Sequence, residues 1–351
     1  MAQISPDISF LVSYVRGQHV KLLSTEDFEN LINKPYEAFI NDLMSFEIGA
    51  ILRSIPSSKS HEIERFLTRR LLDQYSFILN NIPVIFRKFI EAYTTKFEVI
   101  NLQRITRYLF SKADVDLKEA INLRPQEMLG RTAFIAKLIQ CKDLGEFLDE
   151  LTKTEYKDEI EIAEKIYSTV GDIWPLEFAF ETYFIKKMLQ EANKLKYNNK
   201  KDALRFVYSE LLIILILVIL KADFVEVNIK EALQLIPIPE DFPYKRQISK
   251  MMSDNVLKTD LEVLKSFKST KIDDGIKKYE ADKMFLHMEI AIRAFQLNYH
   301  RKLFYKDFGI LSILSYLKQY ETQIQDLNKL LYLKEYKFPV EKTKELIVNL
   351  I

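Results

Sequence analysis

The sequence contains few residues that end helices or strands, or that cross-link a chain. Its 351 residues include seven glycines, ten prolines and one cysteine. A many-stranded protein needs a turn roughly every 8–12 residues, so this scarcity argues against an all-β fold. Leu, Ile, Lys and Glu are abundant, and the composition predicts an all-α protein. The lone Cys141 cannot form a disulfide within the chain, which fits a reducing compartment.

Neither sign of charge predominates, and no apolar run is as long as a membrane span. The chain has 51 Lys and Arg against 50 Asp and Glu. No net field would therefore hold it on nucleic acid or on an anionic bilayer. The longest apolar run, residues 211–220, is about half of the ~20 residues that a membrane helix needs, so we expect it in a buried helix. Residues 1–10 lack the pattern of a secretory signal.

Motifs for nucleotides, metals and catalysis are also missing. The glycines at 130 and 145 stand alone and form no phosphate-binding loop, and the four histidines are scattered. Asp273-Asp274-Gly275 resembles the aspartate-rich motif of all-α terpene synthases, but Lys277 and Lys278 stand where a further aspartate is needed. We interpret this tripeptide as a turn or helix cap. The sequence predicts no catalytic residue, cofactor, metal or directly bound nucleotide.

A carboxylate lies on an apolar stripe in the segment 96–107. Glu98, Leu102, Ile105 and Leu109 stand at i, i+4, i+7 and i+11, which is one face of a helix. We expect one long helix to run from about residue 84 through Glu98 to about residue 110. Glu98 would then point toward the core.

Glutamates recur along the chain at a fixed period. Glu64, Glu177 and Glu289 are separated by 113 and 112 residues. A second set follows the first after 34, 33 and either 32 or 34 residues: Glu98, Glu210 and the pair Glu321/Gln323. Repeats of this kind indicate structural units that stack on one another. We predict three helical repeats, residues 1–114, 115–225 and 226–351, in a pseudo-threefold arrangement.

Local signals place several helix ends. Ser24 followed by Asp27 is similar to a capping box and predicts a helix start. Pro175 suits the first turn of a helix, because its missing N–H is not needed there.

Buried carboxylates must be satisfied, because an unpaired one costs several kcal/mol. The stripe glutamates either line a polar cavity or pair with an arginine, or they reach solvent at the stripe edge or accept hydrogen bonds from helix ends. The arginines available as partners are Arg65, Arg69, Arg104 and Arg293.

Three stretches resemble a known family. They are Tyr14–Arg16 with Lys21–Leu31, then Phe97–Ile105 with its Glu-x-x-Asn-Leu pattern, and finally Gly309–Leu317 with Gln319–Leu327. They are similar to the C subunit of archaeal-type (A/V-type) rotary ATPases, which is equivalent to the d subunit of the eukaryotic vacuolar enzyme. Two departures are Asp326, where the family has Asn, and Ile213-Ile214, where it has Asn-Leu.

The resemblance implies a funnel-shaped, non-catalytic subunit of the central stalk, or rotor. Such a subunit stands on the cytoplasmic face of the membrane proteolipid ring, is held there by protein contacts, and passes torque to the central shaft during ATP synthesis and ion transport. The polar positions expected on core stripes are Glu64, Glu98, Asn101, Glu177, Glu210, Glu289 and Glu321. The alternative is an α-solenoid adaptor that binds a partner helix or peptide in a groove.

Overall fold

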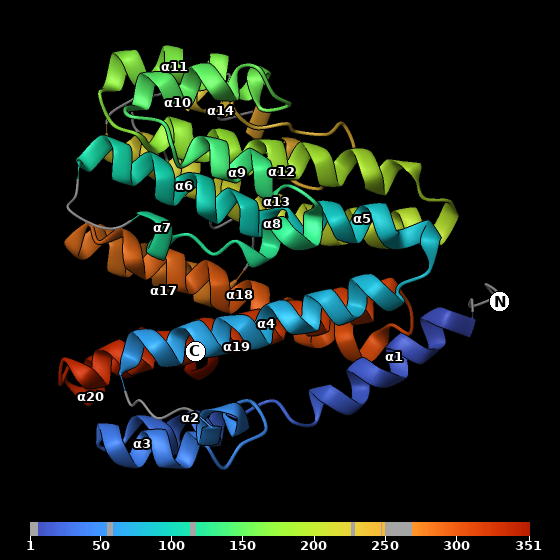
Figure 1. The fold of residues 1–351 in the computed structure, drawn as a ribbon, viewed down its shortest axis with the longest axis vertical. Coiled ribbons are helices and arrows are strands. Elements are labelled where there is room, and N and C mark those ends of the chain that lie inside the picture. The colour runs from blue at the N-terminus through green and yellow to red at the C-terminus, as the bar shows by residue number, and fades with distance from the viewer. Residues whose placement is uncertain (1–5, 55–58, 113–116, 226–228, 247, 250–268) are drawn as a thin grey trace. The chain divides into compact units, whose positions relative to one another are not determined.

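The structure is a computed structural model that describes residues 6–54, 59–112, 117–225, 229–246, 248–249 and 269–351. Within these ranges the regular elements are all helices (Figure 1), which confirms the predicted all-α class. The chain divides into two compact units. Unit 1 combines Met1–Pro83 with Lys268–Ile351, and unit 2 is Val84–Phe267.

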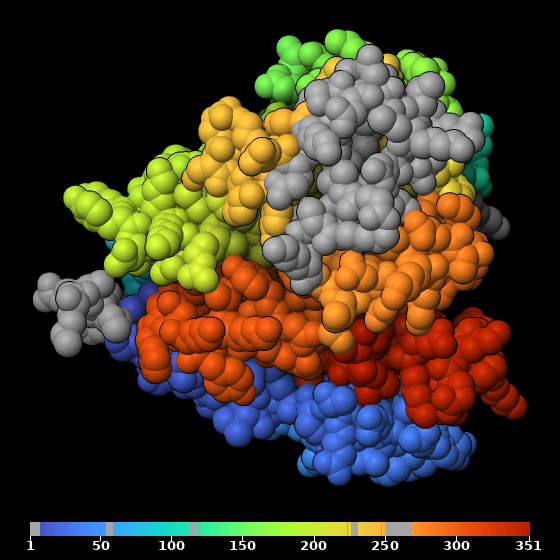
Figure 2. Space-filling view, turned by 180° about the vertical axis from the view of Figure 1, so that it is seen from behind, coloured from blue at the N-terminus to red at the C-terminus, as the bar shows by residue number. Residues whose placement is uncertain are grey.

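The helices of unit 1 come from both ends of the chain. They are α1 (Pro6–His19), α2 (Thr25–Ile32), α3 (Tyr36–Leu43), the 3-10 helix η1 (Ala50–Ser54), α4 (Ser60–Asn81), α17 (Thr270–Asp282), α18 (Phe285–Lys306), α19 (Ile310–Glu335), α20 (Val340–Lys344) and the 3-10 helix η2 (Val348–Leu350). In Figure 2 the red residues near the end of the chain lie against the blue N-terminal residues. The contacts between these two parts of the chain include those of α2 with α20 and with η2.

Helix α19 forms the centre of unit 1. Most of its side chains are buried, and it packs against α18, α4 and α1. Its polar residues Gln319, Glu321 and Gln323 are buried along with the apolar ones. Because α19 is surrounded by other helices, its polar side chains cannot all face solvent. They must therefore form hydrogen bonds within the protein.

Unit 2 combines long and short helices. Its elements are α5 (Val84–Thr94), α6 (Lys96–Ser111), α7 (Leu117–Ala120), α8 (Arg124–Leu129), α9 (Thr132–Leu138), α10 (Leu144–Leu151), α11 (Lys157–Val170), α12 (Trp174–Lys194), α13 (Tyr197–Phe224) and α14 (Ile229–Leu233). Helix α12 packs against α5, α6, α11 and α13, so it is the central helix of this unit.

Several local predictions are confirmed. Ser24 and Asp27 form a capping box, in which the Asp27 amide donates to Ser24 Oγ (3.1 Å) and the Ser24 amide donates to Asp27 Oδ2 (2.7 Å). Pro175 lies in the first turn of α12. Cys141 is buried.

The apolar run 211–220 lies inside α13, as predicted. By length and composition this helix could cross a membrane, since an 18-residue window within Tyr197–Ala222 has a mean hydropathy of 2.4. However, 72% of that window is buried within the protein. The apolar side chains are therefore largely covered by neighbouring helices, as in the core helix of a globular unit.

The expected single helix around Glu98 is wrong in one respect, because it is divided at Thr95 into α5 and α6. The hydroxyls of Thr94 and Thr95 donate to the carbonyls of Ile90 (2.8 Å) and Glu91 (3.2 Å), one turn back. Such bonds compete with the helical ladder and bend helices. The division therefore has a local cause.

The interpretation of Asp273-Asp274-Gly275 as a turn or cap is also wrong, since all three residues lie inside α17. Gly275 is buried where α17 meets α18. A Cβ at this position would lie 2.5 Å from the Ala291 Cβ and 3.2 Å from the Met288 Sδ. The glycine therefore permits the close approach of two helices and does not end one.

We expect Gly275→Ala to lower the free energy of unfolding by about 1–3 kcal/mol, because the added methyl overpacks the contact between α17 and α18. Gly17→Ala is the matched control. It also lies within a helix, α1, but nothing lies within 4 Å of its would-be Cβ. This change should stabilise the protein by about 0.5–1 kcal/mol. Urea unfolding of both variants tests the pair, and equal effects would contradict the close-packing argument.

Candidate functional site

The main polar cluster of unit 2 is built around the Glu98 carboxylate of α6, which is 0% exposed. Arg131 Nε donates to Glu98 Oε2 at 2.6 Å, and the Tyr156 hydroxyl donates to Glu98 Oε1 at 2.7 Å. Both carboxylate oxygens therefore have a strong donor. This satisfies the requirement that a buried charge be both paired and hydrogen bonded.

Local backbone geometry places Arg131 beside Glu98. Gly130, directly after α8, has a φ of +67°, a left-handed conformation that glycine adopts without strain. The Arg131 amide then donates to the Gln126 carbonyl at 2.7 Å, which closes the turn before α9. The turn aims the arginine side chain back at α6.

A second carboxylate and an aromatic ring complete the surroundings of Arg131. Its NH1 pairs with Glu155 Oε1 at 2.6 Å, and its guanidinium carbon lies 4.3 Å from the centre of the Phe134 ring. Burial by itself would lower the pKa of Arg131, but attraction to Glu98 and the hydrogen bond between them raise it. Burial and then the Glu98 charge raise the pKa of the Tyr156 hydroxyl well above its ordinary value.

Asn101 lies one turn after Glu98 and holds the chain just before Arg131. Its Nδ2 donates to the Asn122 carbonyl (2.7 Å) and to Gln126 Oε1 (2.9 Å), and its Oδ1 accepts from the Asn122 amide (3.3 Å). Glu98 and Asn101 together bind residues 122–131 to α6. The Glu-x-x-Asn pattern therefore fastens the connecting chain to the long helix.

The other predicted polar positions of unit 2 lie apart from this cluster. Glu177 on α12 accepts from Arg107 Nε at 2.5 Å, with side chains 19% and 60% exposed. Glu210 lies in α13 and is 8% exposed.

In unit 1 the predicted glutamates lie on three different helices. Glu64 on α4 accepts a hydrogen bond from the Tyr332 hydroxyl on α19. Glu289 on α18 pairs with Arg293, whose NH1 also donates to Gln325 (3.1 Å). Glu321 is 6% exposed and accepts from Gln325 Nε2 at 3.4 Å. Each of these three carboxylates therefore contacts a polar side chain that helps to join or cover helices.

The sequence analysis missed the partners of Glu98. Of the four arginines proposed, Arg293 pairs with Glu289, and Arg104 donates to the Ala120 carbonyl. The partners that the structure shows are Arg131 and Tyr156, which stand 33 and 58 residues after Glu98. One sequence feature could have indicated Arg131: it directly follows Gly130, and a glycine at that position is typical of a helix end where the chain turns back.

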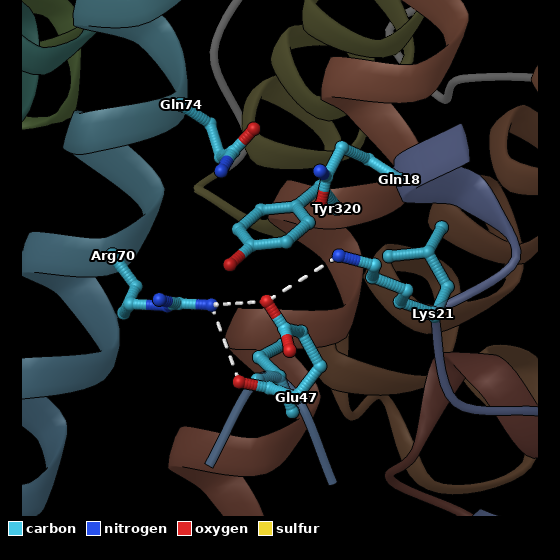
Figure 3. Close-up of a pocket in the computed structure, with 8 residues that line it drawn as sticks. Gln18, Lys21, Glu47, Arg70, Gln74 and Tyr320 are labelled. Atoms are coloured by element: carbon cyan, nitrogen blue, oxygen red, sulfur yellow. Dashed lines mark hydrogen bonds and ion pairs between the residues drawn. The ribbon is translucent and has the colours of Figure 1, made fainter. Parts of the chain in front are cut away.

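A small pocket in unit 1 was also unforeseen. Figure 3 shows the Glu47 carboxylate between Lys21 and Arg70, with 3.6 Å ion pairs to each, and Tyr320 above it. The cavity has a volume of about 10 Å³. This is room for roughly one water molecule and too little for an organic substrate. Within the described ranges no group of three or more His, Cys, Asp or Glu could hold a metal ion.

Comparison with known proteins places this all-α chain among the subunits of rotary ATP synthases. A sequence model of the ATP synthase (C/AC39) subunit family matches residues 11–346, so the chain belongs to that family. This confirms the resemblance found in the sequence.

Its relatives include archaeal proteins named as the C subunit of the A-type ATP synthase. The chain is 24% identical to that of Pyrococcus horikoshii over 348 residues, which cover 95% of this chain and 88% of the relative. It is 23% identical to that of Methanobrevibacter smithii over 305 residues, with 83% and 76% covered.

We expect Glu98→Gln to lower the free energy of unfolding by about 2–3 kcal/mol, because Arg131 loses its buried counter-charge. The cost stays below that of a fully buried pair because Glu155 remains beside Arg131. Glu177→Gln is the control and should cost less than about 1 kcal/mol, since its partner Arg107 is exposed. Denaturant unfolding measures both, and equal losses would contradict the role given to the Glu98 pair.

We expect stability to fall as pH rises above about 10, partly because of Tyr156. The folded protein holds the Tyr156 proton more tightly than the unfolded chain, so unfolding releases it and becomes easier in alkali. Tyr156→Phe should make the free energy of unfolding fall less steeply between pH 10 and pH 12. Tyr197→Phe, at a site 91% exposed, is the control. An unchanged slope in Tyr156→Phe would show that this hydroxyl does not contribute.

Proposed function

We propose that the protein is a non-catalytic central-stalk subunit of a V/A-type ATP synthase or ATPase. In this role it couples the membrane proteolipid ring to the central shaft, so that rotation and ion transport are linked. It would lie at the cytoplasmic face of the membrane, held by protein contacts. Membership of the ATP synthase (C/AC39) subunit family across residues 11–346 is the observation that carries this proposal.

The contacts of the charged side chains on the long helices also support a mechanical role. Glu98 is paired with Arg131, Glu64 with Tyr332 and Glu289 with Arg293. Each pair ties one helical segment to another or reinforces a long helix. General acid–base catalysis needs a titratable group within reach of a substrate, whereas these groups are engaged in packing.

The three predicted repeats agree with the lengths of the long helices. The first long helices of the repeats, α4, α12 and α18, have 22, 21 and 22 residues. Of the second long helices, α13 has 28 residues and α19 has 26. Similar lengths at matching places favour an internal repeat, with the boundaries 1–114, 115–225 and 226–351.

Packing within each unit favours a closed arrangement of these repeats. In unit 2, α12 of the second repeat packs on α5 and α6 of the first. In unit 1, α4 of the first repeat packs in the same way on α19 of the third. An open solenoid adaptor would keep its first and last repeats apart. We therefore favour the pseudo-threefold funnel over the adaptor.

Co-purification tests the proposed function. An affinity-tagged chain, extracted from its native membranes in mild detergent, should carry proteolipid-ring and shaft subunits that mass spectrometry identifies. Removing the membrane fraction before extraction is the control and should abolish recovery of the proteolipid. Recovery of the chain with soluble partners alone would contradict the proposal. Small-angle scattering of the isolated chain then separates a compact funnel from an elongated adaptor.

A further inference from the structure

Asn349, in the 3-10 helix η2, joins three helices of unit 1. Asp326 Oδ2 on α19 accepts from both the Asn349 amide (2.8 Å) and its Nδ2 (2.9 Å). Arg301 of α18 donates to Asn349 Oδ1 at 2.9 Å, and Thr25 Oγ1 of α2 donates to its carbonyl at 3.3 Å. One residue thus uses its backbone and its side chain to hold α2, α18 and α19 together.

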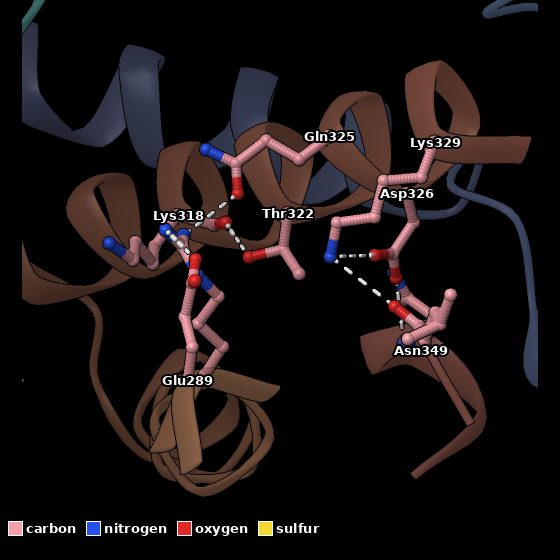
Figure 4. Close-up of polar contacts among 9 residues, drawn as sticks. Glu289, Lys318, Thr322, Gln325, Asp326, Lys329 and Asn349 are labelled. Carbon is pink, nitrogen blue, oxygen red and sulfur yellow. Dashed lines mark hydrogen bonds and ion pairs between the residues drawn. The ribbon is translucent and has the colours of Figure 1, made fainter. Parts of the chain in front are cut away.

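Polar and apolar contacts hold the rest of this segment. Lys329 Nζ donates to the Leu346 carbonyl at 3.3 Å and lies 3.8 Å from Asp326 Oδ1. Figure 4 shows the Lys329 ammonium beside both Asp326 and Asn349. Val348 belongs to an apolar cluster with Ile290, Ala294 and Leu297 of α18, and Leu346 packs against that cluster.

The segment forms a layer between α2 and the α18–α19 pair. The main neighbours of α2 are α3, α20 and η2, whereas η2 also contacts α18 and α19. Much of the attachment of α2 to the long helices therefore passes through η2. Other polar links also join α2, α3 and their flanking residues to the long helices. They include the bond from Gln323 Nε2 to the Leu23 carbonyl, those from Lys334 to the carbonyls of Ile32 and Lys34, and the bond between the Tyr36 hydroxyl and Ser60 Oγ.

The same device holds the chain after the first repeat. Asn101, three residues after Glu98, captures groups of residues that stand 21 and 25 positions later in the chain. Asp326, three residues after Gln323, captures Asn349, which stands 23 positions later. In the middle copy the matching residue is Ile213, which has no polar side chain. Asn101 in unit 2 and Asp326 in unit 1, which stand at matching places, therefore both attach a later segment of the chain to a helix by hydrogen bonds.

We propose that residues 346–351 are a clasp that fixes the α2–α3 hairpin to α18 and α19, and that opening the clasp releases this hairpin while the long helices stay packed. Asn349 closes the clasp by donating hydrogen bonds from its backbone amide and its side chain to the Asp326 carboxylate. The position of α2 and α3 in unit 1 therefore depends on residues 346–351, which are distant from them in sequence.

Hydrogen exchange of the full-length chain, followed by mass spectrometry, tests the clasp. Asn349→Ala removes the side-chain bonds to Asp326 and Arg301. We expect amides of α2 to exchange about tenfold faster, with less than about a twofold change in α4 and α19. Asn193→Ala is the matched control, because Asn193 is exposed and bonds only within its own helix in unit 2. It should leave exchange in α2 unchanged.

A milder variant keeps the test decisive if Asn349→Ala does not fold. Thr25→Val removes only the hydroxyl that donates to the Asn349 carbonyl, and it should speed exchange in α2 about threefold. Two results would overturn the clasp. One is faster exchange of residues 346–351 with α2 unaffected. The other is equal acceleration throughout unit 1, which would indicate a general loss of stability.

Discussion

A polar group buried on a long helix must be hydrogen bonded, and this constraint determines where the connecting chain runs in both units. Glu98 and Asn101 lie inside unit 2, at 0% and 1% exposure, and residues 122–131 lie where they can satisfy them. Asp326 imposes the same requirement in unit 1 and is met by Asn349. Leaving any of these groups without a partner would cost about 1–3 kcal/mol or more.

This constraint also accounts for the buried charges of a protein proposed to have a mechanical role. A part that transmits torque must resist sliding of its helices, and apolar contacts alone are non-directional. Charge-assisted hydrogen bonds such as Arg131 to Glu98 have narrow geometry and fix the register of the packed segments. The pattern suits a mechanical subunit of a rotary ATP synthase.

Several features could be predicted from the sequence because they depend on neighbouring residues. The capping box of Ser24 and Asp27, the first-turn position of Pro175 and the helical state of residues 211–220 each follow from a few adjacent side chains. The break at Thr95 and the helical position of Gly275 escaped prediction. The break depends on whether the hydroxyls of Thr94 and Thr95 donate to backbone carbonyls one turn back. The helical position of Gly275 depends on close packing against Ala291 of another helix, 16 residues later in the sequence.

By itself, then, the sequence determined the all-α class, the apolar stripes and the family, since periodicity, caps and motifs are local and are written directly in the residue order. Only the tertiary structure decided what each buried polar group binds. Arg131, Tyr332 and Asn349 stand 33, 268 and 23 residues from the carboxylates they meet. Such distances in sequence are closed only when whole helices pack, because ridges, grooves and turns then bring a particular pair of side chains within reach.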